Sequence, residues 1–410
     1  MQDNEKKPAL RFKGFTDPWE QRKLDEIANF SKGVGYSKND LCEEGTPIIL
    51  YGRLYTKYET SIFDVDTFVK GKAGSVYSKG GEVIVPASGE TAEDISIASV
   101  VVKPGILLGG DLNIVSPTAE YDSAFLALTI SSGATHKYLS SLAQGKSVVH
   151  LHNADIQSVS AKFPTKREQE KIHLLFGKID TLITLHQRKY EKLVNIKKSM
   201  LDKMFPPNGA SVPEIRFKGF TDPWEQRKLG DVADIVGGGT PSTNNPNYWD
   251  GDIDWYAPAE IAGQIYFDSS QRKITEQGYE NSSAKMLPPG TVLFTSRAGI
   301  GKTAILSKKG CTNQGFQSIV PHNDELDSYF VFSRTDELKQ YGELVGAGST
   351  FVEVSGKQMA AMNLKMPTTI EEQQTIGRFF KRLDTLITLH QRKLEKLQNI
   401  KKSCLEKMFV

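Results

Sequence analysis

A chain of 410 residues is long for one hydrophobic core and favours two or more domains. With 39% hydrophobic and 24% charged residues and a mean hydropathy of −0.37, it has no apolar run long enough to suggest a membrane span. Three distant cysteines without a C-x-x-C spacing argue against a disulfide framework or a zinc site, and the polar start MQDNEKKPAL argues against a secretory signal. We therefore expect a cytoplasmic protein.

The net charge of +2 is unevenly distributed along the chain. Residues 162–203 carry +6 and residues 365–407 carry +5, which leaves −9 on the remainder. The basic residues are concentrated in two segments, and the remainder lacks the uniformly basic surface of a stand-alone DNA-binding protein.

A segment near the beginning of the chain occurs twice. The sequence RFKGFTDPWEQRKL occupies residues 11–24 and, unchanged, residues 216–229. We call these copies the opening segments, and we expect each to form a short strand followed by a helical turn, with Trp19 and Trp224 as packing anchors. A helix cap at Asp-Pro-Trp-Glu and a contact with partner proteins are the alternatives.

Each opening segment is followed by a stretch with no counterpart in the other half of the chain. In the first stretch, residues 83–86, 98–105 and 109–115 are typical of strands, and a helix is expected around residues 123–132. In the second, strands are expected at residues 291–296 and 303–307, and a helix at about residues 327–341. Both stretches indicate mixed α/β structure without the regular βαβ spacing of a nucleotide-binding sheet.

The two halves end in nearly identical closing segments. DTLITLHQRKYEKLVNIKKSMLDKMF at residues 180–205 returns as DTLITLHQRKLEKLQNIKKSCLEKMF at residues 384–409, with 22 of 26 positions identical. Apolar residues recur at spacings of three and four, interrupted by Lys197 in the first copy and Lys401 in the second. This pattern predicts long helices, the first over about residues 168–204 and roughly 55 Å long.

The apolar stripe of these helices is wider than a two-stranded seam. Leu182, Leu185 and Ile196 add to it, and the extra width indicates further partners. The helices most simply pack on each other as an antiparallel pair. Packing of each helix on its own domain, or a homodimer, is the alternative.

The predicted fold is α+β. It has two mixed α/β domains in pseudo-two-fold tandem, separated by a pair of long antiparallel coiled-coil helices. The expected segments are a first domain at residues 1–163, a helix at 164–205, a linker at 206–214, a second domain at 215–366 and a second helix at 367–410.

Two motifs resemble nucleotide or base sites without completing them. SRAGIGKTA at residues 296–304 has Ser296 where a phosphate-binding loop needs glycine, so we expect Gly299 and Gly301 to form a turn between strands. NPNYW at residues 245–249 resembles the base-holding motif of adenine methyltransferases, but Asn247 replaces a proline. A polar turn is the preferred interpretation.

Two histidines offer a partial metal site. His150 and His152 would share a face if both lay on one strand, but no further ligand has a usable spacing. The sequence contains no Ser-His-Asp order or close carboxylate pair either. We therefore expect no metal site and no catalytic centre.

What remains is a set of polar, aromatic and Gly-rich loops suited to base edges and phosphates, although such residues are equally common in ordinary surface loops. The candidate DNA contacts of the first half are Tyr36, Arg53, Tyr55, Lys57, Ser88, Glu90, Thr91, Lys146, His150 and His152. Those of the second half are Thr240, Ser242, Tyr248, Trp249, Ser296, Arg297, Lys302, Asn313, Gln314, Gln317, Ser349 and Thr350.

The repeated halves, together with TPSTNNPNYWDGDIDWYAPAEI, TNQGFQSIVP, PASGETAEDISIAS and LAQGKSVVHLHN, resemble the specificity subunit of type I restriction–modification enzymes over essentially the whole chain. The resemblance implies two target recognition domains, each reading half of an asymmetric bipartite site in double-stranded DNA. It also implies helices that set the spacer and dock two methyltransferase subunits, which two restriction subunits then join.

The resemblance further implies a chain that is not catalytic by itself, with S-adenosylmethionine, ATP and Mg²⁺ bound by the partner subunits. The residues expected to contact partners are Leu182, Leu185, Tyr190, Leu193, Ile196, Leu386, Leu389, Leu394, Leu397 and Ile400. A coiled-coil scaffold that reads no DNA is the competing hypothesis. The target bases and the spacer length are not deducible from the loops, because side chains give no transferable code.

Overall fold

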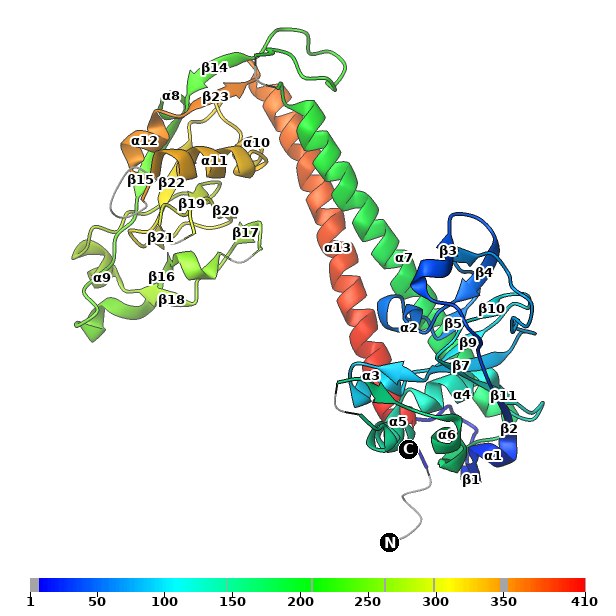
Figure 1. Cartoon of the computed structure of the whole chain (residues 1–410). Coiled ribbons are helices and arrows are strands. Elements are labelled where there is room, and N and C mark those ends of the chain that lie inside the picture. Colours follow the sequence, from blue (N-terminus) through cyan, green and yellow to red (C-terminus); the bar gives the residue numbers. More distant parts are fainter. Residues whose placement is uncertain are drawn as a thin grey trace. The chain divides into compact units, whose positions relative to one another are not determined.

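The computed structural model describes residues 7–145, 147–207, 209–261, 263–297, 299–346 and 353–409. The chain folds as two compact units: unit 1 is residues 1–189 with 390–410, and unit 2 is residues 190–389. Each unit combines one of the two dissimilar stretches with parts of both closing segments (Figure 1). Both units are of mixed α/β structure, as predicted.

The opening segments form a strand and a helical turn in both units, which confirms the prediction. In unit 1 the elements are β1 (Glu20–Lys23), α1 (Leu24–Ile27) and β2 (Ala28–Lys32), and in unit 2 they are β14 (Glu225–Lys228), α8 (Leu229–Val232) and β15 (Ala233–Gly237). The first strand pairs antiparallel with the strand that precedes the long helix, namely β13 (Ser160–Phe163) in unit 1 and β23 (Asn363–Met366) in unit 2. The repeat therefore joins the beginning of each dissimilar stretch to its end.

The arginine that begins each opening segment binds a buried glutamate in the first turn of a long helix. Arg11 Nε and Nη2 donate to Glu168 Oε1 and Oε2, both at 2.7 Å. Arg216 makes the same contact with Glu372, at 2.7 and 2.8 Å. A bidentate pair of this kind adds geometric specificity as well as energy. With Trp19 and Trp224 each only 4% exposed, as predicted, the repeat serves as a structural frame.

Each unit is built on a five-stranded sheet, and the strand order is the same in both. In unit 1 the order is β2, β11 (Leu112–Pro117), β7 (Glu82–Pro86), β9 (Ser99–Val101) and β5 (Ser61–Ile62). In unit 2 it is β15, β22 (Gln317–Pro321), β19 (Val292–Phe294), β20 (Thr303–Leu306) and β17 (Tyr266–Phe267). These strands confirm those expected from the sequence, although the strand expected at residues 98–105 is limited to β9.

The apolar runs of the central strands have a simple cause. Val83 and Val85 of β7 belong to one buried cluster, whereas Ile84 between them belongs to another. Because successive side chains of a strand point to opposite faces, a strand covered on both faces needs consecutive apolar residues.

The two sheets also agree in register. Val83 of unit 1 pairs with Val115, and Val292 of unit 2 pairs with Ile319. The edge strands agree as well, because Pro117 and Pro321 pair with the first residues of β2 and β15. Positions in one unit can therefore be matched to positions in the other by counting along paired strands.

Smaller elements complete unit 1. A four-stranded sheet has the order β10 (Leu107–Leu108), β4 (Thr46–Ile49), β6 (Phe68–Val69) and β3 (Leu41–Cys42), and β8 (Ser88–Gly89) pairs with β12 (Val149–His150). The helices are η2 (Lys38–Asp40), α2 (Arg53–Thr56), α3 (Ala92–Ile95), α4 (Ser123–Ile130), α5 (Gly133–Leu142) and α6 (Asn153–Ser158). Of these, α4 packs on β7, β9 and β11, and it matches the helix expected around residues 123–132.

Unit 2 has a three-stranded sheet in the order β18 (Arg272–Ile274), β16 (Trp249–Tyr256) and β21 (Cys311–Thr312). Its helices are η3 (Pro246–Tyr248), η4 (Pro258–Glu260), α9 (Glu276–Glu280), α10 (Ser328–Phe332), α11 (Thr335–Gly346) and α12 (Gly356–Ala360). The single helix expected at residues 327–341 is wrong, because the chain breaks between α10 and α11. Arg334 at the break is buried and bonds the carbonyl of Lys365 and the carboxylate of Glu337.

The closing segments are helical, as predicted: α7 spans Lys166–Met204 and α13 spans Ile370–Met408. In unit 1, Asp180 of α7 binds Lys401 Nζ of α13 at 2.6 Å, and His186 Nδ1 lies 2.7 Å from His390 Nδ1. Later residues of α7 thus meet earlier residues of α13, so the two helix segments of this unit are antiparallel. Among the described residues, no helix combines the length and apolar character needed to cross a membrane.

Unit 2 repeats this arrangement with the partners exchanged. Lys197 Nζ of α7 binds Asp384 Oδ1 of α13 at 2.6 Å, and the ring of Phe205 lies 5.9 Å from that of Phe380. Lys197 and Lys401 are the two residues that interrupt the apolar stripe in the sequence. They interrupt it because each forms an ion pair with an aspartate on the other helix.

The end of α13 completes the core of unit 1. Phe409 is 7% exposed, and its ring centroid lies 6.4 Å from Trp19, 5.4 Å from Phe125 and 6.1 Å from Phe176. In unit 2, Phe205 follows α7 and packs in the corresponding way. Each hydrophobic core therefore contains an aromatic residue from the closing segment of the other half of the sequence.

Candidate nucleic-acid interface

Several predicted residues of unit 1 meet where β7 ends. Residue Ser88 of β8 pairs with His150 of β12, and Ser88 Oγ lies 3.2 Å from His150 Nδ1. The Tyr55 hydroxyl donates to the carbonyl of Ser88 at 2.8 Å. Burial raises the pKa of Tyr55, so its phenol stays protonated and remains a donor.

Exposed polar groups surround this point. Glu90 is exposed in the turn after β8, and Thr91 caps α3 by accepting a hydrogen bond from the Asp94 amide at 3.0 Å. The rings of His150 and His152 are parallel, with centroids 6.3 Å apart. Placement of both histidines on one strand is wrong, because β12 ends at His150 and His152 caps α6. We call Tyr55, Ser88, Glu90, Thr91, His150 and His152 the unit 1 tip.

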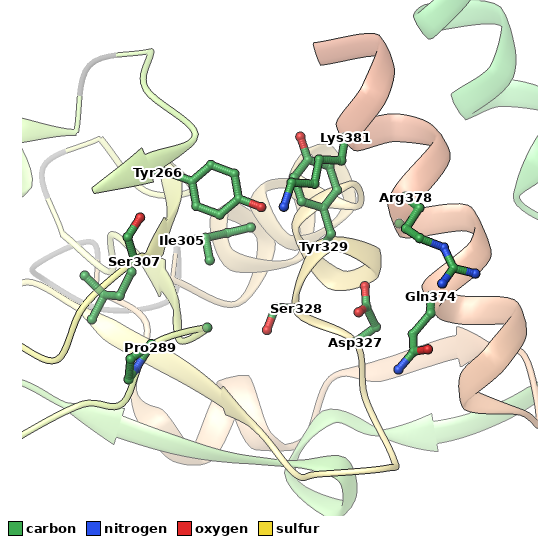
Figure 2. A pocket seen from close by; sticks show the side chains of 13 residues that line it. Tyr266, Pro289, Ile305, Ser307, Asp327, Ser328, Tyr329, Gln374, Arg378 and Lys381 are labelled. Carbon is green, nitrogen blue, oxygen red and sulfur yellow. The ribbon is translucent and has the colours of Figure 1, made fainter. Parts of the chain in front are cut away.

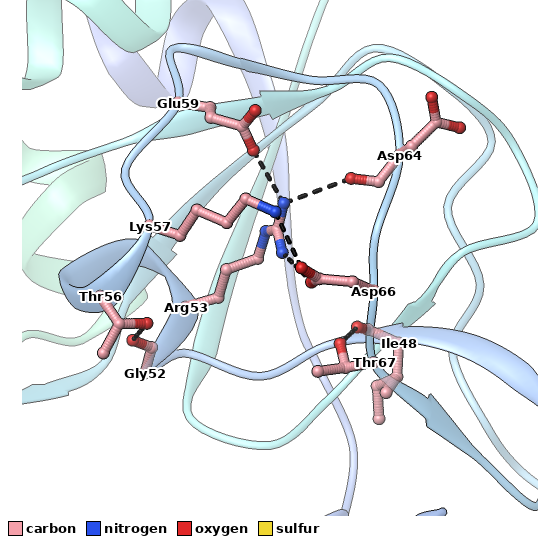
Figure 3. A network of polar contacts seen from close by, with 9 residues as sticks. All are labelled: Ile48, Gly52, Arg53, Thr56, Lys57, Glu59, Asp64, Asp66 and Thr67. Atoms are coloured by element: carbon pink, nitrogen blue, oxygen red, sulfur yellow. Dashed lines mark hydrogen bonds and ion pairs between the residues drawn. The ribbon is translucent and has the colours of Figure 1, made fainter. Parts of the chain in front are cut away.

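Arg53 and Lys57 lie in a local network of ion pairs (Figure 3). The guanidinium of Arg53 is buried and donates to Glu59 and Asp66, at 2.7 and 2.8 Å, and to the carbonyl of Asp64 at 3.2 Å. Lys57 Nζ binds Asp66 at 2.8 Å, and this hydrogen bond lowers the pKa of Asp66 to about 2. These contacts hold the loop after α2, and a base contact by Arg53 would require breaking them.

Tyr36 is also held within unit 1. Its hydroxyl lies 2.6 Å from Ser75 Oγ and accepts from the Lys72 amide, and Lys72 Nζ lies 4.9 Å from the ring centroid. The lysine is in turn bound to Asp40 at 2.6 Å. The hydroxyl of Tyr36 and one face of its ring are therefore already engaged within unit 1.

In unit 2 the corresponding region gathers residues from four segments. Arg297 Nη2 binds Glu353 Oε1 at 2.6 Å, and the Ser296 amide donates to the Gly315 carbonyl at 2.8 Å. The Gly315 amide in turn donates to Asn313 Oδ1 at 2.7 Å. Thr240 and Gln314 are joined by a short hydrogen bond between their side chains. We call Thr240, Arg297, Asn313, Gln314 and Glu353 the unit 2 tip.

The other predicted residues of unit 2 differ in accessibility. Lys302 is exposed and follows the turn between β19 and β20, in which Gly299 and Gly301 have φ of +97° and +93°, as the sequence predicts. Ser296 is fully buried, and Gln317 is half-buried at the start of β22. Ser296 therefore supports the tip from beneath and does not face a ligand.

The predicted residues around the 3₁₀ helix η3 have a packing role. Trp249 is buried, donates through Nε1 to the Ser242 carbonyl at 3.2 Å, and packs edge-on against Trp255 at 5.2 Å. The guanidinium of Arg272 covers its ring at 3.7 Å. A base cannot stack on the face of Trp249 that Arg272 occupies. Tyr248 is half-buried beside it, and Ser242 is exposed.

Three predicted residues, Lys146, Ser349 and Thr350, lie outside the described residues. Conversely, Glu353 and Arg272 are charged residues of these regions that the sequence did not indicate. Glu353 follows Arg297 by 56 positions, and neither repeat includes it. Among the described residues, no group of three or more His, Cys, Asp or Glu side chains has the arrangement of a metal site.

The apolar stripe of the long helices is partly uncovered. Leu182, Leu185, Leu386 and Leu389 are 42–44% exposed, although Ile179 and Leu383 on the same helices are buried. Ile400 is also exposed, while the other predicted partner residues are half-buried, namely Tyr190, Leu193, Ile196, Leu394 and Leu397. Exposed leucines at corresponding places of both helices are a surface suited to protein partners.

Figure 2 shows a pocket of unit 2 between α13 and the edge of the five-stranded sheet, with Asp327, Arg378 and Lys381 in its lining. Asp327 caps α10 as Asp122 caps α4 in unit 1. His173 Nδ1 lies 3.2 Å from Asp122 Oδ2, whereas α13 has Gly377 at the corresponding place. Burial raises the pKa of Asp327. The units therefore differ at this place, with histidine in unit 1 and glycine in unit 2, and none of the predicted DNA contacts lines the pocket.

Comparison with known proteins gives a consistent result. The family model described as type I restriction modification DNA specificity domain matches the chain twice, at residues 16–195 and 221–399. The type I restriction enzyme MjaIX specificity subunit of Methanocaldococcus jannaschii is 34% identical over 190 residues, which cover 46% of this chain and 44% of that protein. The putative MjaX specificity subunit of the same organism is 22% identical over 405 residues, or 94% of this chain and 91% of that protein. The chain thus spans less than half of the first relative and most of the second.

A solved structure extends the likeness to the whole fold. The S subunit of the type I restriction–modification system from M. genitalium has a TM-score of 0.66 with this chain at 14% identity, covering 98% of this chain and 99% of that one. At this identity the likeness concerns the fold alone. Since the family model covers most of the sequence in two copies, this chain belongs to the family of type I restriction–modification DNA specificity domains.

Proposed function

We propose that this chain is the DNA-reading, non-catalytic specificity subunit of a type I restriction–modification complex. Each unit reads one half of an asymmetric bipartite site. The observation that carries this proposal is the matched scaffold of the two units, with the same strand order and register but different polar side chains at the tips. Different donors and acceptors on one framework give different base preferences, so the two half-sites differ.

The exposed leucines of α7 and α13 dock two methyltransferase subunits. Leu182 and Leu185 on α7 correspond to Leu386 and Leu389 on α13, so the same apolar surface occurs once on each helix. Two restriction subunits then join the complex. S-adenosylmethionine, ATP and Mg²⁺ bind the methyltransferase and restriction subunits, and this chain directs adenine methylation and restriction to the site.

The two long helices act as an antiparallel coiled coil that sets the spacer between the half-sites. The ion pairs from Asp180 to Lys401 and from Lys197 to Asp384 support this proposal, because they fix the register of α7 against α13. Four residues inserted after Thr184 alone would shift that register. A matched insertion after Thr184 and after Thr388 keeps it, and we expect it to lengthen the spacer by one or two base pairs with both half-sites unchanged. An unchanged spacer would refute the role of the helices as a ruler.

The decisive experiment is long-read detection of modified adenines in cells that express the chain with its methyltransferase. We expect one bipartite motif with dissimilar halves and a constant spacer. A copurified complex that neither methylates nor binds a defined sequence would refute DNA reading and favour the coiled-coil scaffold. The matched control is a strain that expresses the methyltransferase without this chain.

A further inference from the structure

The tips of the two units carry different polar pairs at corresponding positions. Counting along the paired strands from Val83 and Val292 matches Ala87 to Ser296. The backbone confirms this match, because Ala87 accepts from Leu151 at 3.1 Å and Ser296 accepts from Val354 at 3.0 Å. The residues after Ala87 and before Leu151 therefore correspond to those after Ser296 and before Val354.

These residues are Ser88 and His150 in unit 1 and Arg297 and Glu353 in unit 2. In each unit the two side chains contact each other: Ser88 Oγ and His150 Nδ1 are 3.2 Å apart, and Arg297 Nη2 and Glu353 Oε1 are 2.6 Å apart. One place in the fold thus holds a hydroxyl–imidazole pair in one unit and a guanidinium–carboxylate ion pair in the other.

The backbone beneath both pairs is fixed in the same way. His152 and Ser355 each begin a short helix, and their amides donate to Asp155 at 2.8 Å and to Gln358 at 2.9 Å. Since the backbone that leads into each pair is held by the same contacts, the difference between the units at this place lies in the side chains. A fixed backbone with exchangeable polar side chains is what a specificity-determining position requires.

The ion pair of Arg297 and Glu353 in unit 2 has the geometry of a side chain held in position to bind the edge of a base. The Arg297 side chain is 46% exposed, and Glu353 holds its guanidinium in place. A guanidinium has five N–H donors, more than one carboxylate accepts, so donors remain for a second planar acceptor. Arginine reads guanine through O6 and N7, which is the commonest specific contact in the major groove.

We infer that these two pairs are the corresponding base-reading positions of the two units, and that Arg297, oriented by Glu353, reads a guanine in the half-site of unit 2. This inference rests on the proposed function. In unit 1 the imidazole of His150, which is bonded to Ser88 through Nδ1, presents Nε2 alone to a base. A single hydrogen bond discriminates less than a bidentate one, so the corresponding position of that half-site tolerates more than one base.

Long-read mapping of modified adenines with the full complex tests the inference through variants of both residues. We expect Arg297→Ala to make one guanine of one half-site degenerate, so that a discrimination of roughly ten- to hundredfold falls to near unity. The other half-site and the spacer stay unchanged, and Glu353→Gln weakens the same position by a smaller factor. Transplanting the unit 1 pair, with Arg297→Ser and Glu353→His together, relaxes that position without affecting any other. Lys308→Ala, an exposed residue of unit 2 away from the tip, is the control that leaves the motif intact.

Each outcome of these experiments either supports or contradicts the reading of a guanine by Arg297. If Arg297→Ala abolishes methylation altogether, the Arg297→Lys variant is used in place of the alanine variant, because lysine keeps the charge but loses the bidentate geometry. A degenerate base in that variant supports the inference, and an unchanged motif overturns it. A wild-type complex without a bipartite motif refutes the proposed function, whereas a bipartite motif in which no Arg297 variant changes a base refutes only the reading role of this pair.

Discussion

Mutation of Phe409 can test whether the end of α13 completes the hydrophobic core of unit 1. Its side chain is 93% buried among Trp19, Phe125 and Phe176, with the ring of Phe125 stacked at 5.4 Å. Truncation of a buried phenylalanine to alanine costs about 3–5 kcal/mol through lost transfer energy and the cavity left behind. We expect Phe409→Ala to destabilise unit 1 by this amount and to leave the stability of unit 2 unchanged, because Phe409 belongs to the core of unit 1 alone.

Hydrogen exchange followed by mass spectrometry on the purified complex resolves the two units in one sample. A loss of 3–5 kcal/mol lowers the protection of amides that exchange through unfolding by about two to four orders of magnitude. We expect this loss in β7 and β11 of unit 1 and none in β19 and β22 of unit 2.

Phe205→Ala is the matched variant in unit 2. Phe205 is half-buried, so the expected loss is smaller, and it appears in β19 and β22. If Phe409→Ala lowers protection equally in both units, or leaves β7 and β11 fully protected, then the end of α13 does not complete a core that belongs to unit 1.

Three further predictions concern single residues. Asp384→Ala leaves the buried Tyr329 hydroxyl and a lysine without their acceptor, so the free energy of unfolding of unit 2 falls by about 2–4 kcal/mol in chemical denaturation; a loss below about 0.5 kcal/mol would contradict this role. The hydrogen bond with Asp122 raises the pKa of His173, so its contribution to stability is full below the ordinary histidine pKa of about 6.5 and is lost as pH rises through the raised value. His173→Gly should therefore flatten the fall in the melting temperature of unit 1 as pH rises over that range. If the variant keeps the wild-type pH profile, the pair of His173 and Asp122 does not cause the fall. Leu386→Glu should reduce the copurified methyltransferase to about half without lowering the melting temperature, because the side chain is 42% exposed and the matching surface on α7 is unchanged; normal copurification would place docking elsewhere.

The sequence predicts most of the framework because the framework is repeated. Identical opening segments must form the same local structure, and two long apolar stripes must be covered, which predicts β1, β14, α7 and α13. The bidentate contact between Arg11 and Glu168 is not predictable in this way, because it joins residues 157 positions apart. The helix break at Arg334 is not predictable from the sequence for the same reason, because the buried guanidinium of Arg334 bonds a carbonyl 31 residues away.

The candidate site is less predictable, because the same polar residue types serve structure and recognition. Arg53 and Arg297 look alike in the sequence, yet the first is buried among acidic groups and the second is half-exposed beside one carboxylate. Glu353 is recognised only when the registers of the two sheets are matched. Composition identifies the loops, and pairing in three dimensions decides which of their side chains are held and which are presented.

The composition of unit 1 from residues 1–189 and 390–410 has a consequence for its biosynthesis. Unit 2 is one continuous stretch and can fold as soon as it leaves the ribosome. Unit 1 must wait for Phe409, 220 residues after Lys189, which at about 5–20 residues per second is a delay of roughly 10 to 40 s. During that time its apolar strands lack their last aromatic partner and are exposed to chaperones and proteases. A ribosome that stops before residue 409 would release a chain with unit 2 complete and unit 1 incomplete, and cellular quality control can remove such a chain.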